Sequence, residues 1–161
     1  MTAKYLETCP CERVALMAGT FNPYTVGHDA IVRRGLQLFD RIIIAVGVNR
    51  LKVEADPSLA MDAEARAQAI RRCYAHVPRV KVIVSNGLTV DVAREHGARF
   101  LLRGVRSVKD FEYERDMADL NRQLDGLETV VLYAEPQMAA VSSSAVRDIA
   151  AYGHDVSQFL P

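Results

Sequence analysis

Five short runs of aliphatic and β-branched residues constrain the fold of this chain more than any other feature of its sequence. Most of these runs are apolar without interruption, as in strands buried on both faces of a parallel sheet. Segments with helical patterns separate them, so the alternation predicts right-handed crossovers and a doubly wound α/β fold. We expect a five-stranded parallel sheet with helices on both faces and strands at residues 14–18, 42–48, 80–84, 100–103 and 129–133.

Helix signals lie between the predicted strands. Asp62 is a predicted N-cap for a helix over residues 63–75. Gly97 stands where a helix over residues 90–96 is expected to stop. A further helix, from about residue 110 to residue 123, has apolar side chains on one face, namely Tyr113, Met117, Leu120 and Leu124.

Length and charge narrow the class of protein. A chain of 161 residues allows one domain with a full core, so we expect a single domain over residues 1–161 with an N-terminal extension at 1–12. The 20 basic and 20 acidic side chains leave no net charge. This balance argues against a nucleic-acid partner, because nucleic-acid binding depends on an extended basic surface. A compact anionic ligand remains compatible with it.

Residues 1–12 lack the continuous apolar stretch of a secretory signal. No run elsewhere approaches the roughly 18 apolar residues of a membrane helix, so we expect a cytoplasmic protein with no membrane partner. The three cysteines, Cys9, Cys11 and Cys73, have no disulfide-framework spacing and fit reduced thiols. A metal site at Cys9 and Cys11 would need two more ligands, and none lies nearby in the sequence.

A glycine-containing loop at residues 19–28 joins the first predicted strand to a helix expected over residues 29–39. A helix start offers unpaired backbone N–H groups and a partial positive charge. Gly19 and Gly27 allow the backbone to approach an anion, and His28 adds a donor that can be charged near neutral pH. The loop therefore predicts a phosphate site, although the same residues would also suit a plain turn and helix start.

Polar residues follow other predicted strands as well. Asn49 and Lys52 come after the second strand, and Arg103 and Arg106 come at the end of the fourth. The fifth leads to serines at 142–144, of which the first two are candidate caps for a last helix that ends before residue 153. Because the carboxyl ends of parallel strands meet at one edge of a sheet, we expect these residues to form a single site.

Three motifs resemble those of known enzymes. The loop G-T-F-N-P-Y-T-V-G-H at 19–28 resembles the signature of the Rossmann-like nucleotidyltransferases, in which threonine at the position of Thr25 is typical of the phosphopantetheine adenylyltransferase family. R-G-V-R-S-V-K-D-F-E-Y-E at 103–114 and V-S-S-S-A-V-R at 141–147 resemble two further segments of that family. The motifs occur in the family's order, and the resemblance extends over residues 14–161.

The sequence departs from the family pattern in a few places. Asn22 replaces the commoner aspartate and is often seen in nicotinamide mononucleotide adenylyltransferases, which leaves the acceptor open. Met138 and Ala139 lie where an aromatic residue often contacts adenine. The first dozen residues have no counterpart, and other members add a C-terminal helix beyond Pro161.

The resemblance implies transfer of an adenylyl group from ATP to the phosphate of 4′-phosphopantetheine, which gives dephospho-coenzyme A and pyrophosphate. The attacking phosphate is already anionic, so we expect direct in-line attack at the α-phosphorus without a general base. By resemblance, His28 donates to the α-phosphoryl oxygens and Thr20 positions the attacking phosphate. Lys52 and Arg103 hold that phosphate.

The resemblance also implies binding residues. Thr89 and Asn121 line the pantetheine arm. Glu114 contacts ribose or adenine, or instead pairs with a basic neighbour on the helix surface. Mg²⁺ is expected on ATP phosphates and water, with no protein ligand. The residues expected around ATP are Thr20, Phe21, His28, Gly104, Val105, Arg106, Glu114, Met138, Ala139, Ala140, Val141, Ser142, Ser143 and Ser144.

Other functions stay open. A related adenylyltransferase or cytidylyltransferase with another acceptor, such as nicotinamide mononucleotide, is favoured by Asn22 and opposed by Thr25 and by the segment 103–114. A non-catalytic sensor of ATP or coenzyme A is opposed by the joint presence of the catalytic candidates. An NAD-dependent dehydrogenase would show G-x-G-x-x-G after the first strand, and the motif is absent. By resemblance we expect a homohexamer and coenzyme A as a feedback ligand.

Overall fold

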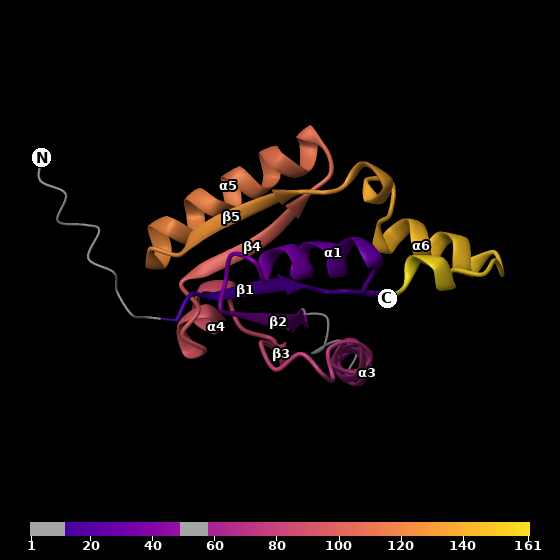
Figure 1. Ribbon diagram of the computed structural model, residues 1–161, viewed down its shortest axis with the longest axis horizontal. Coiled ribbons are helices and arrows are strands. Elements are labelled where there is room, and N and C mark those ends of the chain that lie inside the picture. The colour runs from indigo at the N-terminus through magenta and orange to yellow at the C-terminus, as the bar shows by residue number, and fades with distance from the viewer. Residues whose placement is uncertain (1–11, 49–57) are drawn as a thin grey trace, which may run out of the picture.

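The computed structural model describes residues 12–48 and 58–161, and its centre is one parallel β-sheet (Figure 1). The strands are β1 (Val14–Gly19), β2 (Arg41–Gly47), β3 (Val80–Ser85), β4 (Phe100–Val105) and β5 (Glu128–Tyr133). They lie in the order β3-β2-β1-β4-β5, and every neighbouring pair is parallel. The predicted fold class is confirmed, and each strand lies within one or two residues of its predicted bounds.

Helices cover both faces of this sheet. They are α1 (Val26–Gly35), α3 (Ser58–Cys73), α4 (Thr89–Glu95), α5 (Val108–Asp125) and α6 (Ser143–Ala151), with short 3₁₀ turns η1 (Pro136–Met138) and η2 (Ser157–Phe159). Ile42 and Ile44 of β2 pack in the core formed with α1 and α3, whereas Ile43 packs in the core formed with α4. Successive side chains of a strand point to opposite faces, so a strand covered on both sides is apolar throughout.

The order of the strands changes direction at the centre of the sheet. β1, β2 and β3 follow one another outward, whereas β4 returns to the free side of β1 and β5 extends beyond it. The helix after β1 packs on one face, and the helix after β4 lies beside α4 on the other. Connections that leave to opposite faces open a crevice at the carboxyl ends of β1 and β4, where ligands bind in doubly wound sheets.

Two predicted helix starts are wrong. Thr25 is the N-cap of α1, so His28 lies inside the first turn instead of ahead of the helix. α3 begins at Ser58, and Asp62 lies within it and pairs with Arg66 four residues on (2.9 Å). An ion pair between residues four positions apart stabilises the interior of a helix. Asp62 therefore belongs to the exposed face of α3 and does not cap its start.

Two other predicted helix boundaries are confirmed. Gly97 follows the end of α4 with φ +68°, a left-handed conformation that glycine adopts without strain. Of the two candidate serines, Ser142 is the N-cap of α6, because its Oγ accepts a hydrogen bond from the backbone N–H of Ala145 (3.1 Å).

The apolar face of α5 points away from the sheet. Tyr113, Leu120 and Leu124 are 60%, 52% and 61% exposed, whereas Glu114 and Asn121 on the same helix are buried. α5 lies beside β5 at one edge of the molecule (Figure 1). The orientation of α5 is therefore set by buried polar side chains, and no residue of the described ranges covers Leu120 and Leu124 enough to bury them.

Among the helices in the described ranges, none combines the length and the apolar character that crossing a membrane requires.

Candidate active site

The loop between β1 and α1 holds the ring of His28 in one orientation. The backbone N–H of Thr25 donates to Nδ1 of His28 (3.0 Å). An amide N–H only donates, so Nδ1 is the acceptor and Nε2 carries the ring proton. The contact is half of a capping box, with histidine at a position that usually holds Glu or Gln. His28 therefore keeps one N–H to offer to a ligand.

The charge on His28 differs from the sequence-based expectation. Burial, with a smaller contribution from the positive charges of Arg106 and Arg103, lowers the pKa of His28 from 6.5 to about 4. The ring is therefore neutral at pH 7, and the expected charge near neutral pH is not found. Its neutral Nε2–H still donates to a phosphoryl oxygen.

Gly19 leaves space for an aromatic ring, in addition to the role in anion approach that the sequence predicts. A Cβ added at Gly19 would lie 3.0 Å from Cζ of Phe21, closer than carbon atoms normally approach. Phe21 itself has φ +48°, which is unusual for a residue with a side chain. At Gly27 an added Cβ would make only an ordinary contact of 3.6 Å with the Thr25 hydroxyl. The loop thus folds its phenylalanine back over its own first glycine.

A cavity of about 670 Å³, here called the larger cavity, opens between this loop, the end of β4 and the start of α6. A nucleotide fits a space of this size, since ligand pockets usually measure roughly 300–1,000 Å³. Arg103 is part of its wall. The expected ATP residues that it brings together are Thr20, Phe21, His28, Gly104, Arg106, Glu114, Met138, Val141, Ser142, Ser143 and Ser144.

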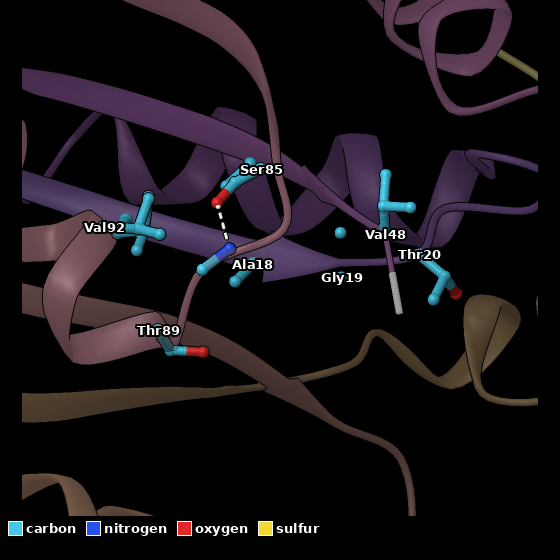
Figure 2. Close-up of a pocket in the computed structure, with 11 residues that line it drawn as sticks. Ala18, Gly19, Thr20, Val48, Ser85, Thr89 and Val92 are labelled. Carbon is cyan, nitrogen blue, oxygen red and sulfur yellow. Dashed lines mark hydrogen bonds between the residues drawn. The ribbon is translucent and has the colours of Figure 1, made fainter. Parts of the chain in front are cut away.

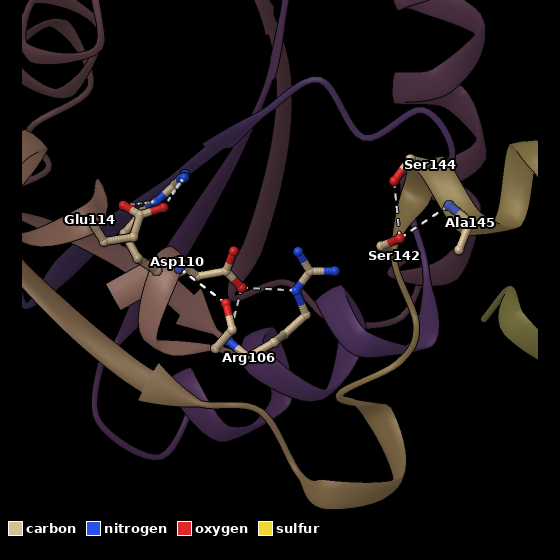
Figure 3. Close-up of polar contacts among 8 residues, drawn as sticks. Arg106, Asp110, Glu114, Ser142, Ser144 and Ala145 are labelled. Atoms are coloured by element: carbon tan, nitrogen blue, oxygen red, sulfur yellow. Dashed lines mark hydrogen bonds and ion pairs between the residues drawn. The ribbon is translucent and has the colours of Figure 1, made fainter. Parts of the chain in front are cut away.

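The start of α6 presents hydroxyl groups to the larger cavity. Ser142 and Ser144 place their Oγ atoms 3.1 Å apart (Figure 3). Ser143 donates its hydroxyl to the carbonyl of Pro23 (2.8 Å), which ties α6 to the β1–α1 loop. The N-termini of α1 and α6 therefore converge on one cavity, and both favour negative charge there.

Basic side chains line the same cavity. The backbone N–H and Nε of Arg106 both donate to Asp110 Oδ2 (3.1 Å each), as Figure 3 shows. Lys109 and Arg147 also line it, and Arg147 donates to the carbonyl of Asn22. Neither Lys109 nor Arg147 was predicted as a site residue. A signal existed, because each lies within two turns of a helix start in a recognised motif.

Arg103 and Glu114 form a two-pronged ion pair in the wall of the larger cavity. Nε and Nη2 of Arg103 donate to the two carboxylate oxygens of Glu114 (2.8 and 2.6 Å), and Nη1 donates to the carbonyl of Ala18 (2.5 Å). Glu114 is only 8% exposed. Pairing with a basic neighbour, the alternative for Glu114, is therefore present, but its carboxylate is buried instead of exposed on the helix surface. A guanidinium carries five N–H groups, so others remain for a phosphate.

A smaller cavity of about 270 Å³ lies on the β2 side of β1 (Figure 2). Ser85 and Thr89 line it, and Ser85 Oγ accepts from the N–H of Gly87 (3.2 Å), which shapes the β3–α4 turn. Thr89 is thus in a cavity wall, as expected for a residue near the pantetheine arm, whereas nothing in the sequence pointed to Ser85. The two cavities share Ala18, Gly19 and Thr20.

Four predicted site residues line neither cavity. Val105 is buried at the end of β4, and Asn121 is buried on α5. Ala139 and Ala140 are exposed on the turn before α6. The remaining predicted residue, Lys52, lies outside the described residues, as do Asn49, Cys9 and Cys11.

Comparison with solved structures shows the same fold. The bifunctional NMN adenylyltransferase/ADP ribose pyrophosphatase of Francisella tularensis superposes with a TM-score of 0.63 over 93% of this chain and 45% of that chain, at 13% identity. The lipopolysaccharide core biosynthesis protein of Thermoplasma volcanium superposes with a TM-score of 0.54 over 78% of this chain and 98% of that chain, at 15% identity. At such identities the likeness concerns the fold alone.

Comparison of sequences gives the family. The model of the family described as cytidylyltransferase-like matches residues 16–149. The phosphopantetheine adenylyltransferase of Porphyromonas gingivalis is 49% identical over 93% of this chain and 95% of its own length. That of Bacteroides thetaiotaomicron is 45% identical over 92% and 95%. Fold and family match define a Rossmann-like nucleotidyltransferase. Within that class, the chain belongs to the phosphopantetheine adenylyltransferases of the cytidylyltransferase-like family.

Proposed function

We propose that this chain transfers the adenylyl group of ATP to the phosphate of 4′-phosphopantetheine, forming dephospho-coenzyme A and pyrophosphate in the cytoplasm as a step of coenzyme A biosynthesis. The observation that carries the proposal is the meeting of two cavities at Thr20. The larger cavity has the phosphate-binding groups that ATP needs. The smaller cavity, with Leu16, Ala45 and Val92 in its wall, suits the pantetheine arm. Two reacting phosphates can meet at the edge that the cavities share.

The reaction is one in-line displacement at the α-phosphorus. An oxygen of the 4′-phosphopantetheine phosphate forms a bond to the α-phosphorus, and the bond from that phosphorus to the bridging oxygen of pyrophosphate breaks. The attacking oxygen is anionic, so no proton has to be removed first. The task of the protein is to align the two polyanions and to stabilise the charge on the α-phosphoryl oxygens.

Thr20, at the edge that the cavities share, and two residues of the larger cavity, His28 and Arg103, take the catalytic roles in this proposal. His28 donates its Nε2–H to an α-phosphoryl oxygen. Thr20 belongs to both cavities and positions the attacking phosphate. Arg103 is bonded to the Ala18 carbonyl at that edge, so its remaining N–H groups can reach the same phosphate. Lys52 joins Arg103 by resemblance alone.

ATP occupies the larger cavity in this proposal. The serines at 142–144 and the side chains of Arg106, Lys109 and Arg147 face the triphosphate. Met138 packs against the adenine, in place of an aromatic residue. Phe21 and Gly104 contribute backbone groups to the nucleotide. Both carboxylate oxygens of Glu114 already accept hydrogen bonds from Arg103, so Glu114 contacts the ribose with the remaining lone pairs of these oxygens.

Mg²⁺ fits this site as an ion carried by ATP. In the part of the chain that the structure describes, no three His, Cys, Asp or Glu side chains gather as metal ligands would. The two carboxylates of the larger cavity, Asp110 and Glu114, are both engaged by arginines. Phosphate oxygens and water would therefore coordinate the ion, which offsets repulsion between the two polyanions.

A pyrophosphate-release assay with ATP, Mg²⁺ and a series of acceptors tests the proposal. We expect turnover with 4′-phosphopantetheine and none with nicotinamide mononucleotide. Asn22 does not argue for the second acceptor, since its side chain is exposed and lines neither cavity. Turnover with nicotinamide mononucleotide alone would overturn the acceptor, and ATP or coenzyme A binding without any turnover would indicate a sensor.

Coenzyme A is the feedback ligand in this proposal. It contains both a pantetheine arm and an adenosine unit, so it can fill the two cavities at once. We expect it to inhibit competitively with ATP and with 4′-phosphopantetheine in initial-rate measurements. Inhibition that neither substrate relieves would place coenzyme A elsewhere.

We also propose that the chain assembles as a homohexamer, as the resemblance implies. The exposed leucines of α5, Leu120 and Leu124, support assembly, because large apolar side chains in one patch favour a covering partner. Sedimentation velocity should give a hexamer for the wild type and smaller species for Leu120→Lys. Tyr152→Lys, at an 85% exposed position on α6's C-terminal side, is the matched control and should stay hexameric.

A further inference from the structure

We infer that Tyr24 and Tyr74 are positioning residues, which fix the ring of His28 for adenylyl transfer. The inference rests on the proposed function, which gives His28 its role. Tyr24 and Tyr74 are each 6% exposed, and neither lines the larger or the smaller cavity. Tyr24 instead lines a separate cavity of about 400 Å³ beside α3. Among the residues of the larger cavity, its ring packs on His28 and Phe21, so we expect its effect on the reaction to pass through these two side chains.

The ring of His28 is packed by two aromatic neighbours. Tyr24 stacks on its face, with ring centroids 5.4 Å apart and planes inclined by 21°. Phe21 meets it edge-on, with centroids 5.2 Å apart and planes at 85°. The bond from Thr25 N–H to Nδ1 fixes the rotation of the ring within its plane, and the stacked tyrosine fixes the plane itself. Together they set the direction of Nε2–H.

A chain of buried hydrogen bonds holds Tyr24 in turn. The hydroxyl of Tyr74 donates to Asp29 Oδ1 (2.6 Å), so the hydroxyl of Tyr24 is the donor to Tyr74 (2.7 Å). Arg33 Nε donates to the other oxygen of Asp29 (2.5 Å). Burial raises the pKa of both tyrosines, so both phenols keep their protons. Each member of the chain has a defined partner.

This chain connects two helices that pack on the same face of the sheet. Tyr24 belongs to the β1–α1 loop, Asp29 and Arg33 belong to α1, and Tyr74 directly follows α3. The plane of the His28 ring is therefore set by the core contact between α1 and α3 before any substrate binds. Such preorganisation matters, because misplacing a reacting group by about 1 Å can cost about 100-fold in rate.

The first test replaces the stacked ring. In Tyr24→Leu we expect kcat to fall at least about tenfold, with the KM for ATP within about twofold of wild type. In the free protein, the pKa of His28 followed by NMR of its ring should rise by about one unit, because water replaces the tyrosine. The other groups that face the ring remain in place, namely Phe21, Thr25, Arg103 and Arg106.

A matched control separates positioning from stability. Phe39 is 5% exposed and packs on Phe100 (centroids 5.4 Å), in the core away from both cavities. We expect both Phe39→Leu and Tyr24→Leu to lower Tm. Phe39→Leu alone should leave kcat and the His28 NMR signals unchanged. Equal effects of the two variants on kcat and on those signals, or no effect of Tyr24→Leu on either, would overturn the inference.

A second set of variants tests the hydrogen-bond chain. Tyr74→Phe leaves the Tyr24 hydroxyl and one Asp29 oxygen without their partners, so we expect kcat to fall about threefold to tenfold. Adding Tyr24→Phe removes the stranded hydroxyl and keeps the stacked ring, so the double variant should recover to within about twofold of Tyr24→Phe alone. A double variant as slow as Tyr74→Phe would overturn the role of Tyr74.

The NMR measurement also separates this inference from the proposed function. The signals of His28 are read without any acceptor, so they report on its positioning whatever the substrate is. A wild-type chain that turns over no acceptor would refute the proposed function alone. A wild-type chain that is active, with a Tyr24→Leu variant equal to it in kcat and in the His28 pKa, would refute the positioning role alone.

Discussion

The two cavities on either side of β1 differ in what forms their walls. Charged and hydroxyl side chains line the larger cavity, among them Arg106, Lys109 and Arg147. Glycines and small aliphatic residues, such as Ala45 and Gly47, dominate the wall of the smaller cavity. Binding a triphosphate requires charge, which side chains supply, whereas binding a thin uncharged arm requires shape, which backbone and small residues supply. Their shared edge is where the chemistry is expected.

Removing the His28 donor of the larger cavity should have the largest effect. In His28→Ala we expect kcat to fall about 100-fold to 1,000-fold, or about 3–4 kcal/mol of transition-state stabilisation, with little change in either KM. Steady-state pyrophosphate release measures this. His76→Ala, at an exposed position, is the control and should match wild type. A folded His28→Ala enzyme with near-full turnover would exclude the proposed role.

The second-largest effect is expected from loosening Arg103, which Glu114 holds in the wall of the larger cavity. Glu114→Gln removes the charge that orients Arg103, so kcat/KM for 4′-phosphopantetheine should fall about tenfold. Glu112→Gln, on an exposed part of α5, is the matched control and should change this ratio less than about twofold. If both variants behave alike, the buried ion pair does not position Arg103.

Narrowing the smaller cavity tests whether its shape selects the acceptor. Thr89→Leu adds volume to that wall, and an overpacked contact costs about 1–2 kcal/mol, so the KM for 4′-phosphopantetheine should rise about tenfold. The KM for ATP should stay constant, because Thr89 does not line the larger cavity. Leu88→Ala, at a 57% exposed neighbour, is the control. A rise in the KM for ATP instead would mean that the cavities are not separate in function.

The smallest effect concerns stability and pH. The pKa of His28 is about 4 in the folded chain against an ordinary value of 6.5. Between these values the unfolded chain binds a proton at His28 that the folded chain does not, so the contribution of His28 to stability is fully present above pH 6.5 and is lost as pH falls toward 4. From about pH 7.5 to 5.5, wild type should lose about 1 kcal/mol more unfolding free energy than His28→Gln in urea titrations. Equal losses would contradict the lowered pKa.

The sheet could be predicted because its signal is local to each strand. A run such as residues 42–46 supplies apolar groups to both cores, so uninterrupted hydrophobicity identifies a buried parallel strand without knowledge of its neighbours. The motif loops were likewise placed correctly at one edge of the sheet, because each follows a strand and parallel strands end together.

The features that could not be predicted from the sequence depend on contacts between elements that are distant along the chain. The direction of α5 follows from Glu114 turning inward to Arg103, eleven positions earlier on β4, and no periodicity in α5 reveals this pairing. The neutral state of His28 depends on burial and on two arginines, one at the end of β4 and one in the loop that follows it. The tyrosine chain joins residues 45 and 50 positions apart. Such pairings become visible only when the chain is folded.

The division of the site at β1 has an evolutionary consequence. The smaller cavity is built from β2, β3 and α4, whereas the larger one is built from α1, β4, α5 and α6, and only residues of β1 and the position after it serve both. A substitution at a residue that lines one cavity alone leaves the lining residues of the other cavity unchanged. A lineage with this architecture can exchange one partner molecule for another while its nucleotide half is inherited intact.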